Sequence, residues 1–156
     1  MSGSLKIGIA GLGTVGKGVI DLLIANQDYI AKKTNKDIEI FGISAKSKLK
    51  DRDLNLKQYQ WFDNPNELAA SKHIDVFVEL IGGEEGVARK SVETALRNSK
   101  HVVTANKALI ANHGLELSKI AELNSTTLNY EAAVAGGIPI IKSLKESLAG
   151  NKIKKI

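Results

Sequence analysis

The stretch LKIGIAGLGTVGKGVI, from Leu5 to Ile20, decides the fold of this chain. It begins with a short apolar run, Leu5–Ala10, which is typical of a buried strand. Gly11, Gly13 and Gly16 follow in the spacing G-x-G-x-x-G, and apolar residues then recur at helical intervals. A strand, a glycine-rich turn and a helix in this order predict a βαβ unit that binds the phosphates of a dinucleotide.

Each glycine of this turn has a different physical task. Gly11 permits the tight turn, Gly13 lets the backbone approach a pyrophosphate, and Gly16 allows the helix to pack closely on the strand. The start of the helix adds unpaired N–H groups and the positive end of its dipole, and both favour phosphate. A tight turn without a ligand is the alternative interpretation. The predicted phosphate-binding loop comprises Gly11, Leu12, Gly13, Thr14, Val15 and Gly16.

Strand and helix patterns alternate along the rest of the chain. Besides the first strand, strand patterns cover residues 37–44, 59–62, 74–81, 101–105 and 126–132. Helical patterns cover residues 14–33, 63–72, 86–100, 113–125 and 137–150. In the second of these helices, Asn64 can cap the N-terminus and Pro65 suits the first helical position. The alternation predicts an α/β domain: a doubly wound, mostly parallel, Rossmann-like sheet with helices on both faces.

The composition fits one globular domain. The 156 residues are 43% hydrophobic and 25% charged, which is enough to bury a core in a domain of ordinary size. No cysteine is present, which excludes disulfides and thiol chemistry. No apolar stretch reaches membrane-spanning length, and the first apolar run is too short for a signal peptide. We therefore expect a cytosolic protein that has no membrane partner.

The chain is basic, with a net charge of +5, which raises the question of a nucleic-acid partner. Its lysines are scattered, however, and aromatic residues make up only 4% of the chain. Surfaces that bind single-stranded nucleic acid combine a basic groove with aromatic stacking platforms. A solvated basic surface is the better interpretation, and we expect no nucleic-acid partner.

Two further motifs end strand patterns that should meet at one edge of the sheet. ELIGG closes one strand with two glycines, which leave room for a flat ring, and VTANKAL closes the next. Ligands of open α/β sheets bind beyond the carboxyl ends of the strands. A lysine there that points into the cleft could bind an anion or polarise an oxygen. A plain turn and a surface lysine are the alternatives. The candidate residues at this edge are Ile81, Gly82, Gly83, Thr104, Asn106 and Lys107.

A loop of small residues, YEAAVAGGIPI, follows the last strand pattern. It exposes carbonyl groups, which hard cations favour as ligands. A plain strand-to-helix loop is the alternative, and the residues alone favour it. His73, His101 and His113 show no metal-ligand spacing, and no serine lies in a G-x-S-x-G setting, so a hydrolase has no support.

Taken together, the motifs resemble those of homoserine dehydrogenase. GLGTVGKGV, VELIGG, HVVTANKALIANHG and YEAAVAGGIPII occur in the family's order and spacing, from about Lys6 to the last residue. The resemblance implies an oxidoreductase that interconverts L-homoserine and L-aspartate 4-semialdehyde with NAD or NADP, in threonine, methionine and isoleucine synthesis. It also implies that the full-length enzyme is a homodimer.

The resemblance implies roles for single residues as well. Gly11–Gly16 would hold the pyrophosphate, and the residues of the two strand-end motifs would lie near the ribose and the nicotinamide. Among these, Lys107 resembles the family lysine that reaches cofactor and substrate at the catalytic centre. The residues that match a family loop able to bind a monovalent cation, Na⁺ or K⁺, largely through backbone carbonyls, are Glu131, Val134, Gly136 and Ile138.

The last residues, GNKIKKI, begin a strand-like alternation that belongs to no completed unit. We expect residues 1–150 to form the NAD(P)-binding domain and residues 151–156 to start a substrate and dimerisation domain that this sequence lacks. In the family, that domain carries the acidic residues that hold the amino group of homoserine and a second lysine that transfers the proton. The chain by itself is therefore expected to be inactive.

The loop after the second strand favours NADP over NAD. A domain specific for NAD has an acid at the end of this strand that binds the ribose hydroxyls. Here that end reads FGISAKSKLK, without an acid between Phe41 and Lys50. Lys46 falls where the family often has an arginine, Lys48 lies close by, and a lysine binds the 2′-phosphate as a point charge. If both lysines are solvated instead, neither cofactor is preferred.

Two other functions share the glycine loop. A regulatory module that senses a nucleotide would need the loop but would have no use for Lys107 beside the nicotinamide. Another NADP-dependent reductase of amino-acid metabolism could have a similar first domain. The stretches TANKAL and AGGIPI favour homoserine dehydrogenase over both.

Overall fold

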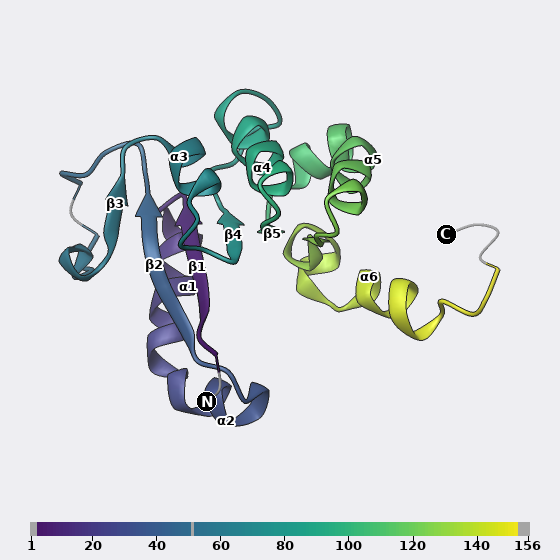
Figure 1. Ribbon diagram of the computed structural model, residues 1–156, viewed down its shortest axis with the longest axis horizontal. Helices are drawn as coiled ribbons and strands as arrows, with labels where there is room; N and C mark the ends of the chain where they lie inside the picture. Colours follow the sequence, from purple (N-terminus) through teal and green to yellow (C-terminus); the bar gives the residue numbers. More distant parts are fainter. Residues whose placement is uncertain (1–2, 51, 153–156) are drawn as a thin grey trace.

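A six-stranded parallel sheet forms the centre of the computed structural model, which describes residues 3–50 and 52–152 (Figure 1). The strand order is β3-β2-β1-β4-β5-β6, and every neighbouring pair is parallel. This confirms the doubly wound α/β prediction, because the order reverses between β1 and β4. The strands are β1 (Leu5–Ala10), β2 (Ile38–Ser44), β3 (Gln60–Phe62), β4 (Val76–Glu79), β5 (His101–Thr104) and β6 (Leu128–Asn129).

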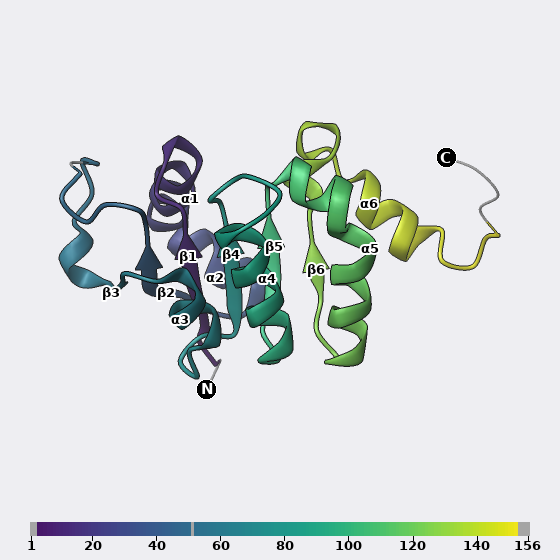
Figure 2. The same ribbon diagram turned by 90° about the horizontal axis from the view of Figure 1, so that it is seen from above.

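The helices pack on the two faces of this sheet. On one face lies α1 (Thr14–Ala25), whose Ile20 is buried with Ile9 and Ile43 of the strands. The helices of the opposite face share a second core with Phe77, and Figure 2 shows α1 and α3 on opposite sides of β1. These helices are α3 (Pro65–Ala70), α4 (Val87–Arg97) and α5 (Lys107–Leu123).

The alternation of side chains along β1 explains how one strand serves both cores. Ile7 and Ile9 point to the α1 face, whereas Gly8 points to the face covered by α3. A Cβ built on Gly8 would lie 2.8 Å from Cδ1 of Leu68, and one on Gly42 of β2 would lie 2.9 Å from the same atom. The two glycines therefore form a hollow in the sheet that the fully buried Leu68 fills.

The first predicted helix is in fact two helices. The pattern over residues 14–33 breaks at Asn26, where α1 ends and α2 (Gln27–Thr34) begins. Asn26 has φ −115° and ψ 15°, and its side-chain Nδ2 donates to the carbonyl of Leu22 at 2.9 Å. An asparagine that binds its own backbone competes with helical geometry, which accounts for the bend.

Capping and packing also decide where other helices and strands begin and end. The predicted cap of α3 is confirmed, because Asn64 accepts a hydrogen bond from the N–H of Asn66 at 2.9 Å. Helix α5 begins at Lys107 rather than at residue 113, because Asn106 caps it. The strand predicted over residues 126–132 is reduced to β6, and the chain then enters 3₁₀ turns from Glu131.

The helix predicted over residues 137–150 is largely replaced by shorter turns. Only α6 (Ile140–Lys142) is α-helical, and a π-helical turn, Ser143–Ser147, follows it. Figures 1 and 2 show this segment leaving the sheet beyond β6, and Ile138 is 65% exposed. Without a buried apolar face, little stabilises a longer helix. The strand start predicted in the terminal KIKKI falls on residues 153–156, which lie outside the described residues.

Within the described part of the chain, no helix is long and apolar enough to cross a membrane.

The hollow under α3 gives a first prediction. Gly8→Ala should lower the free energy of unfolding by about 1–3 kcal/mol, because the new methyl overlaps Leu68. Leu68→Ala alone should cost about 2–5 kcal/mol. The double variant should lose less stability than the sum of the two single losses, by about 1 kcal/mol or more, since the shortened side chain makes room for the methyl. Urea denaturation of the four proteins measures this coupling.

The matched control is Gly18→Ala on α1, where no described heavy atom lies within 4 Å of the new Cβ. It should raise stability by about 0.5–1 kcal/mol, as alanine does in a helix. Losses from Gly8→Ala and Leu68→Ala that add within about 0.5 kcal/mol would show that Leu68 does not fill the hollow.

Candidate functional site

The predicted site residues gather at the carboxyl edge of the sheet. Ala10, Glu79 and Thr104 are partners across β1, β4 and β5, so the loops that follow these strands leave the sheet at one level. The order of the sheet reverses between β1 and β4, and crevices at such switch points hold the ligands of open α/β sheets. The glycine loop and both strand-end motifs therefore share one edge.

Two glycines of the glycine loop are required by the protein's own packing. Gly11 has φ +101°, and a Cβ there would lie 2.3 Å from the carbonyl carbon and oxygen of Leu80. A Cβ on Gly16 would lie 2.0 Å from the carbonyl oxygen of Gly11. These positions exclude any side chain, because the contacts are with backbone atoms.

Gly13 is different, because the protein itself does not require a glycine there. No described heavy atom lies within 4 Å of a Cβ built on it, and its φ of −80° is allowed for any residue. The space above Gly13 is open at the point where the loop enters α1. The missing side chain thus leaves access to the backbone for a ligand that lies on the loop.

The start of α1 offers donors to that open space. Gly13 is the N-cap residue, and the first helical bond runs from the N–H of Lys17 to its carbonyl at 2.9 Å. The N–H groups of residues 14–16 have no acceptor inside the helix, as at every helix N-terminus. Free N–H groups together with the positive end of the helix dipole fit a phosphate group.

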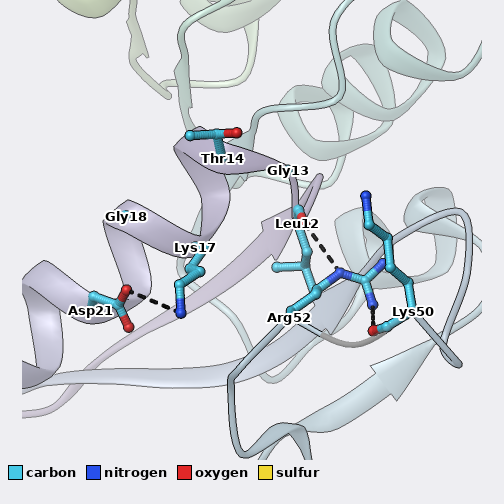
Figure 3. Close-up of a pocket in the computed structure, with 8 residues that line it drawn as sticks. All are labelled: Leu12, Gly13, Thr14, Lys17, Gly18, Asp21, Lys50 and Arg52. Carbon is cyan, nitrogen blue, oxygen red and sulfur yellow. Dashed lines mark hydrogen bonds and ion pairs between the residues drawn. The ribbon is translucent and has the colours of Figure 1, made fainter.

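An open pocket of about 340 Å³ borders this loop, and Figure 3 shows its lining. Three of its side chains are cationic, from Lys17, Lys50 and Arg52, and one is anionic, from Asp21. The Nζ atom of Lys17 lies 3.7 Å from the Asp21 carboxylate. The pocket as a whole therefore favours an anionic ligand. Its lining residues are Leu12, Gly13, Thr14, Lys17, Gly18, Asp21, Lys50 and Arg52.

Arg52 joins the loop after β2 to the glycine loop. Its Nε donates to the carbonyl of Leu12 at 3.1 Å, as Figure 3 shows. Its Nη1 and Nη2 donate to the carbonyls of Lys50 at 2.8 Å and Ser47 at 2.6 Å. A planar guanidinium can make several such bonds at once, so Arg52 holds both loops in one arrangement.

The two lysines predicted to bind a 2′-phosphate do not line this pocket. Lys46 is exposed and does not line the pocket, and Nζ of Lys48 lies 5.8 Å from the ring centroid of Trp61 on β3. The lining of the pocket includes Lys50 and Arg52 instead, to which no sequence motif assigned a role. The sequence signal for these residues was a basic loop that contains no acid between Phe41 and Lys50. Only the path of the loop decides which of its cations faces the pocket.

The loop after β4 depends on glycine for its backbone shape. Gly82 and Gly83 both have φ +84°, and no atom of the described residues lies within 4 Å of a Cβ built on either. Glycine is therefore needed at both positions for the backbone conformation rather than for space. Ile81, at the start of this loop, is 38% exposed.

The second strand-end motif is divided between buried and exposed residues. Thr104 and Asn106 are buried, at 0% and 7% exposure, so their side chains bind protein groups. The Oδ1 atom of Asn106 accepts from the N–H of Leu109 at 3.1 Å and thereby caps α5. Lys107, the first residue of α5, is exposed and forms no ion pair with the described residues.

Side chains of α5 hold the segment that follows Gly83. Asn112 donates to the Glu84 carboxylate at 2.5 Å, and Nε2 of His113 lies 2.7 Å from the Glu85 carboxylate. Arg89 of α4 binds Glu85 as well, and a hydrogen bond to Glu93 raises the pKa of Arg89 above its usual value. This part of the site edge is therefore fixed to both α4 and α5.

The predicted cation loop is folded into turns. The carboxylate of Glu131 accepts hydrogen bonds from the N–H groups of Ile141, at 3.3 Å, and Lys142, so it caps the start of α6. The carbonyl of Val134 accepts from the N–H of Gly137 at 3.0 Å. Gly136 and Ile138 are exposed in the same turns. A cation at this loop would share oxygens that already accept hydrogen bonds.

Comparison with known proteins identifies close relatives. The family model "Homoserine dehydrogenase, NAD binding domain" matches residues 11–131. The homoserine dehydrogenase of Neisseria gonorrhoeae is 44% identical over 97% of this chain and 34% of its own length. The chain therefore spans about a third of the length of that curated relative.

Solved structures give the same result. The crystal structure of a homoserine dehydrogenase from Thiobacillus denitrificans is 39% identical, with a TM-score of 0.86 over 97% of this chain and 35% of that one. A hyperthermophilic archaeal homoserine dehydrogenase in complex with NADPH is 27% identical, with a TM-score of 0.77 over 94% of this chain and 50% of its own.

The different environments of two loop glycines yield a prediction. Gly13→Ala should leave the free energy of unfolding within about 0.5 kcal/mol of the original chain. It should weaken dinucleotide binding at least tenfold, about 1.4 kcal/mol, because the methyl occupies the open space above the loop. Gly16→Ala should lower stability as well, by about 2 kcal/mol or more, because its methyl overlaps a carbonyl oxygen. Thermal melting and calorimetric titration with NADP⁺ measure the two effects.

Gly114→Ala on α5 is the control and should leave dinucleotide binding unchanged, since Gly114 lies within the helix and a Cβ built there would face Ile110, 3.3 Å from its Cγ2. Full affinity for the dinucleotide in Gly13→Ala would place the ligand away from the glycine loop.

Proposed function

Because the chain belongs to the homoserine dehydrogenase family and matches its NAD-binding domain, we propose that it is the dinucleotide-binding part of an enzyme that interconverts L-homoserine and L-aspartate 4-semialdehyde. One observation carries most of the proposal. Gly13 has open space above it at the start of α1, at the switch point of the sheet. That arrangement suits the pyrophosphate of a dinucleotide.

Different residues of the chain bind different parts of the cofactor in this proposal. The amides of residues 14–16 and the loop Gly11–Gly16 hold the pyrophosphate. Gly82 and Gly83 border the nicotinamide half of the cofactor, and neither residue has a side chain that could occupy that space. When bound, the nicotinamide supplies the hydride acceptor for the alcohol. Lys107 is exposed at the same edge, where its ammonium binds the oxygen of the substrate and stabilises charge that develops there.

The rest of the chemistry belongs to residues that this chain does not supply. The chain covers 34% of the Neisseria relative's length, and we assign binding of the homoserine amino group and proton transfer to the part that corresponds to the remainder. Dimerisation is assigned to the same part. A monovalent cation at Glu131, Val134, Gly136 and Ile138 stays a prediction, supported by the oxygen-rich turns alone.

NADP is the preferred cofactor in this proposal. The loop after β2 contains no acid between Phe41 and Lys50 that could bind a ribose 2′-hydroxyl. Lys46, the residue predicted from the sequence, is exposed in the same loop, and Lys50 and Arg52 line the adjacent pocket. Both cations would attract a 2′-phosphate, which NAD lacks.

The division of labour predicts binding without turnover. The purified 156-residue chain should bind NADP⁺ in titration calorimetry and should form no NADPH when homoserine is added. The reason is that we assign the groups that hold the amino group of homoserine and accept its proton to the part of the relatives that this chain does not cover. Ultraviolet absorbance of the reduced cofactor measures turnover, with a full-length homoserine dehydrogenase as the positive control. Homoserine-dependent NADPH formation by the pure chain would contradict the division.

The charged pocket predicts the cofactor preference. NADP⁺ should bind about tenfold more tightly than NAD⁺, about 1.4 kcal/mol, and the difference should shrink as salt screens the cations of the pocket, above all the exposed Lys50. Lys50→Ala should reduce the preference and Lys46→Ala should reduce it less, because only Lys50 lines the pocket. Titrations of both cofactors at low and high salt measure this.

Lys36→Ala provides the control, because Lys36 is exposed just before the amino end of β2, at the opposite edge of the sheet. It should leave the preference unchanged. Equal affinities for the two cofactors in the original chain would show that neither Lys50 nor Arg52 meets a 2′-phosphate.

A further inference from the structure

We propose that Glu79 is a positioning residue that joins the loop Ile81–Gly83 to the start of α5, so that the walls of the nicotinamide half of the site hold one geometry. The inference rests on the proposed function. Glu79 is the last residue of β4, and its side chain is fully buried. The sequence pattern assigned it no role.

Three donors converge on this carboxylate. Its Oε1 accepts from the backbone N–H of Ile81 at 2.7 Å and from that of Gly82 at 3.1 Å. Its Oε2 accepts from the hydroxyl of Thr104 at 2.5 Å. Both oxygens are thus used, one by the loop that follows β4 and the other by the end of β5.

The hydrogen bonds continue from Thr104 and return to the loop. The Thr104 hydroxyl oxygen accepts from the N–H of Asn106 at 3.0 Å. The Nδ2 of Asn106 then donates to the carbonyl of Gly83 at 2.6 Å. The circuit therefore closes on the loop where it began, while Oδ1 of the same asparagine caps α5 through Leu109.

The chemistry of these partners requires an acceptor at residue 79. The two amides and the hydroxyl all donate to it, and a glutamine would direct an N–H₂ group at one of these donors. At such a position in a parallel sheet an apolar side chain is the usual occupant. A buried carboxylate is retained here because it organises groups that an apolar residue would leave unpaired.

The loop that Glu79 organises contains two consecutive glycines. Gly82 and Gly83 have no side chains to hold them, and glycine loses more backbone entropy on ordering than any other residue. The loop donates two hydrogen bonds to the Glu79 carboxylate and accepts one from Asn106, and these three bonds fix it. Lys107 follows Asn106 directly, so the same circuit sets the position of its backbone relative to the loop.

Substitutions can distinguish a role of Glu79 in positioning the loop from a role in the stability of the fold alone. Glu79→Gln keeps the size of the side chain and breaks the circuit at its centre. Asn106→Asp keeps an oxygen to cap α5 but loses the Nδ2 donor to Gly83, so it tests the circuit should Glu79→Gln fail to fold. Thr104→Val removes the hydroxyl, and Thr104→Ser restores it as the conservative variant.

The measurement compares two ligands on the 156-residue chain. NADP⁺ reaches the nicotinamide half of the site, whereas 2′,5′-ADP carries only the adenine half. Glu79→Gln, Asn106→Asp and Thr104→Val should each weaken NADP⁺ binding about tenfold or more and change 2′,5′-ADP binding less than twofold, and Thr104→Ser should bind both normally. Faster amide hydrogen exchange at Ile81 and Gly82 in Asn106→Asp is also expected, although that substitution touches neither amide.

The results that would overturn the proposal are distinct from a failure of the proposed function. Equal losses for both ligands, or full NADP⁺ affinity in all three variants, would reduce Glu79 to a structural residue. Unchanged amide exchange in Asn106→Asp would show that the circuit does not act as a unit. An original chain that binds neither ligand would overturn the proposed function, and the role of Glu79 with it.

Discussion

The structure depends on one contact between backbone segments, the approach of the glycine loop to the end of β4. The Cα of Gly11 lies so close to the carbonyl of Leu80 that no Cβ fits, and Gly16 lies as close to the carbonyl of Gly11. These two approaches bring α1 down onto β1 and bring the loops of β1 and β4 together at the reversal of strand order. The crevice that holds a ligand in such sheets exists only because side chains are absent there.

The two halves of the site are held by different kinds of interaction. Around the pocket beside α1, the exposed Lys50 and the half-buried Lys17 and Arg52 supply long-range attraction, and Arg52 fixes the loop after β2 through three carbonyl groups. At the other half, Glu79 and Asn106 act through short hydrogen bonds within a buried circuit. Salt weakens the first kind of interaction and scarcely reaches the second, because burial excludes the ions that screen charge. Ionic strength should therefore affect the pocket beside α1 more than it affects the circuit around Glu79.

The segment after β6 is organised differently from the rest of the domain. After the turns from Glu131 to Gly137, the apolar residues Ile138, Ile140 and Leu148 expose 65%, 41% and 41% of their surface. Glu131 compensates in part, since its carboxylate holds the first amides of α6. Local hydrogen bonds thus give this segment its shape where apolar burial is small, which explains why a helical sequence pattern ended as a short helix and a π-helical turn.

The sequence by itself determined the glycine loop, the alternation of strands and helices, the cap at Asn64 and the edge of the sheet where the candidate residues meet. Each of these follows from local spacing, because periodicity and turn chemistry act over a few residues. Only the tertiary structure decided that Arg52 and Lys50, rather than Lys46, line the pocket and that Glu79 binds Thr104 across neighbouring strands. These bonds join residues far apart in the chain, as Arg52 and Leu12 are. Which such residues meet depends on the order of strands in the sheet and the path of each loop, and a local pattern contains neither.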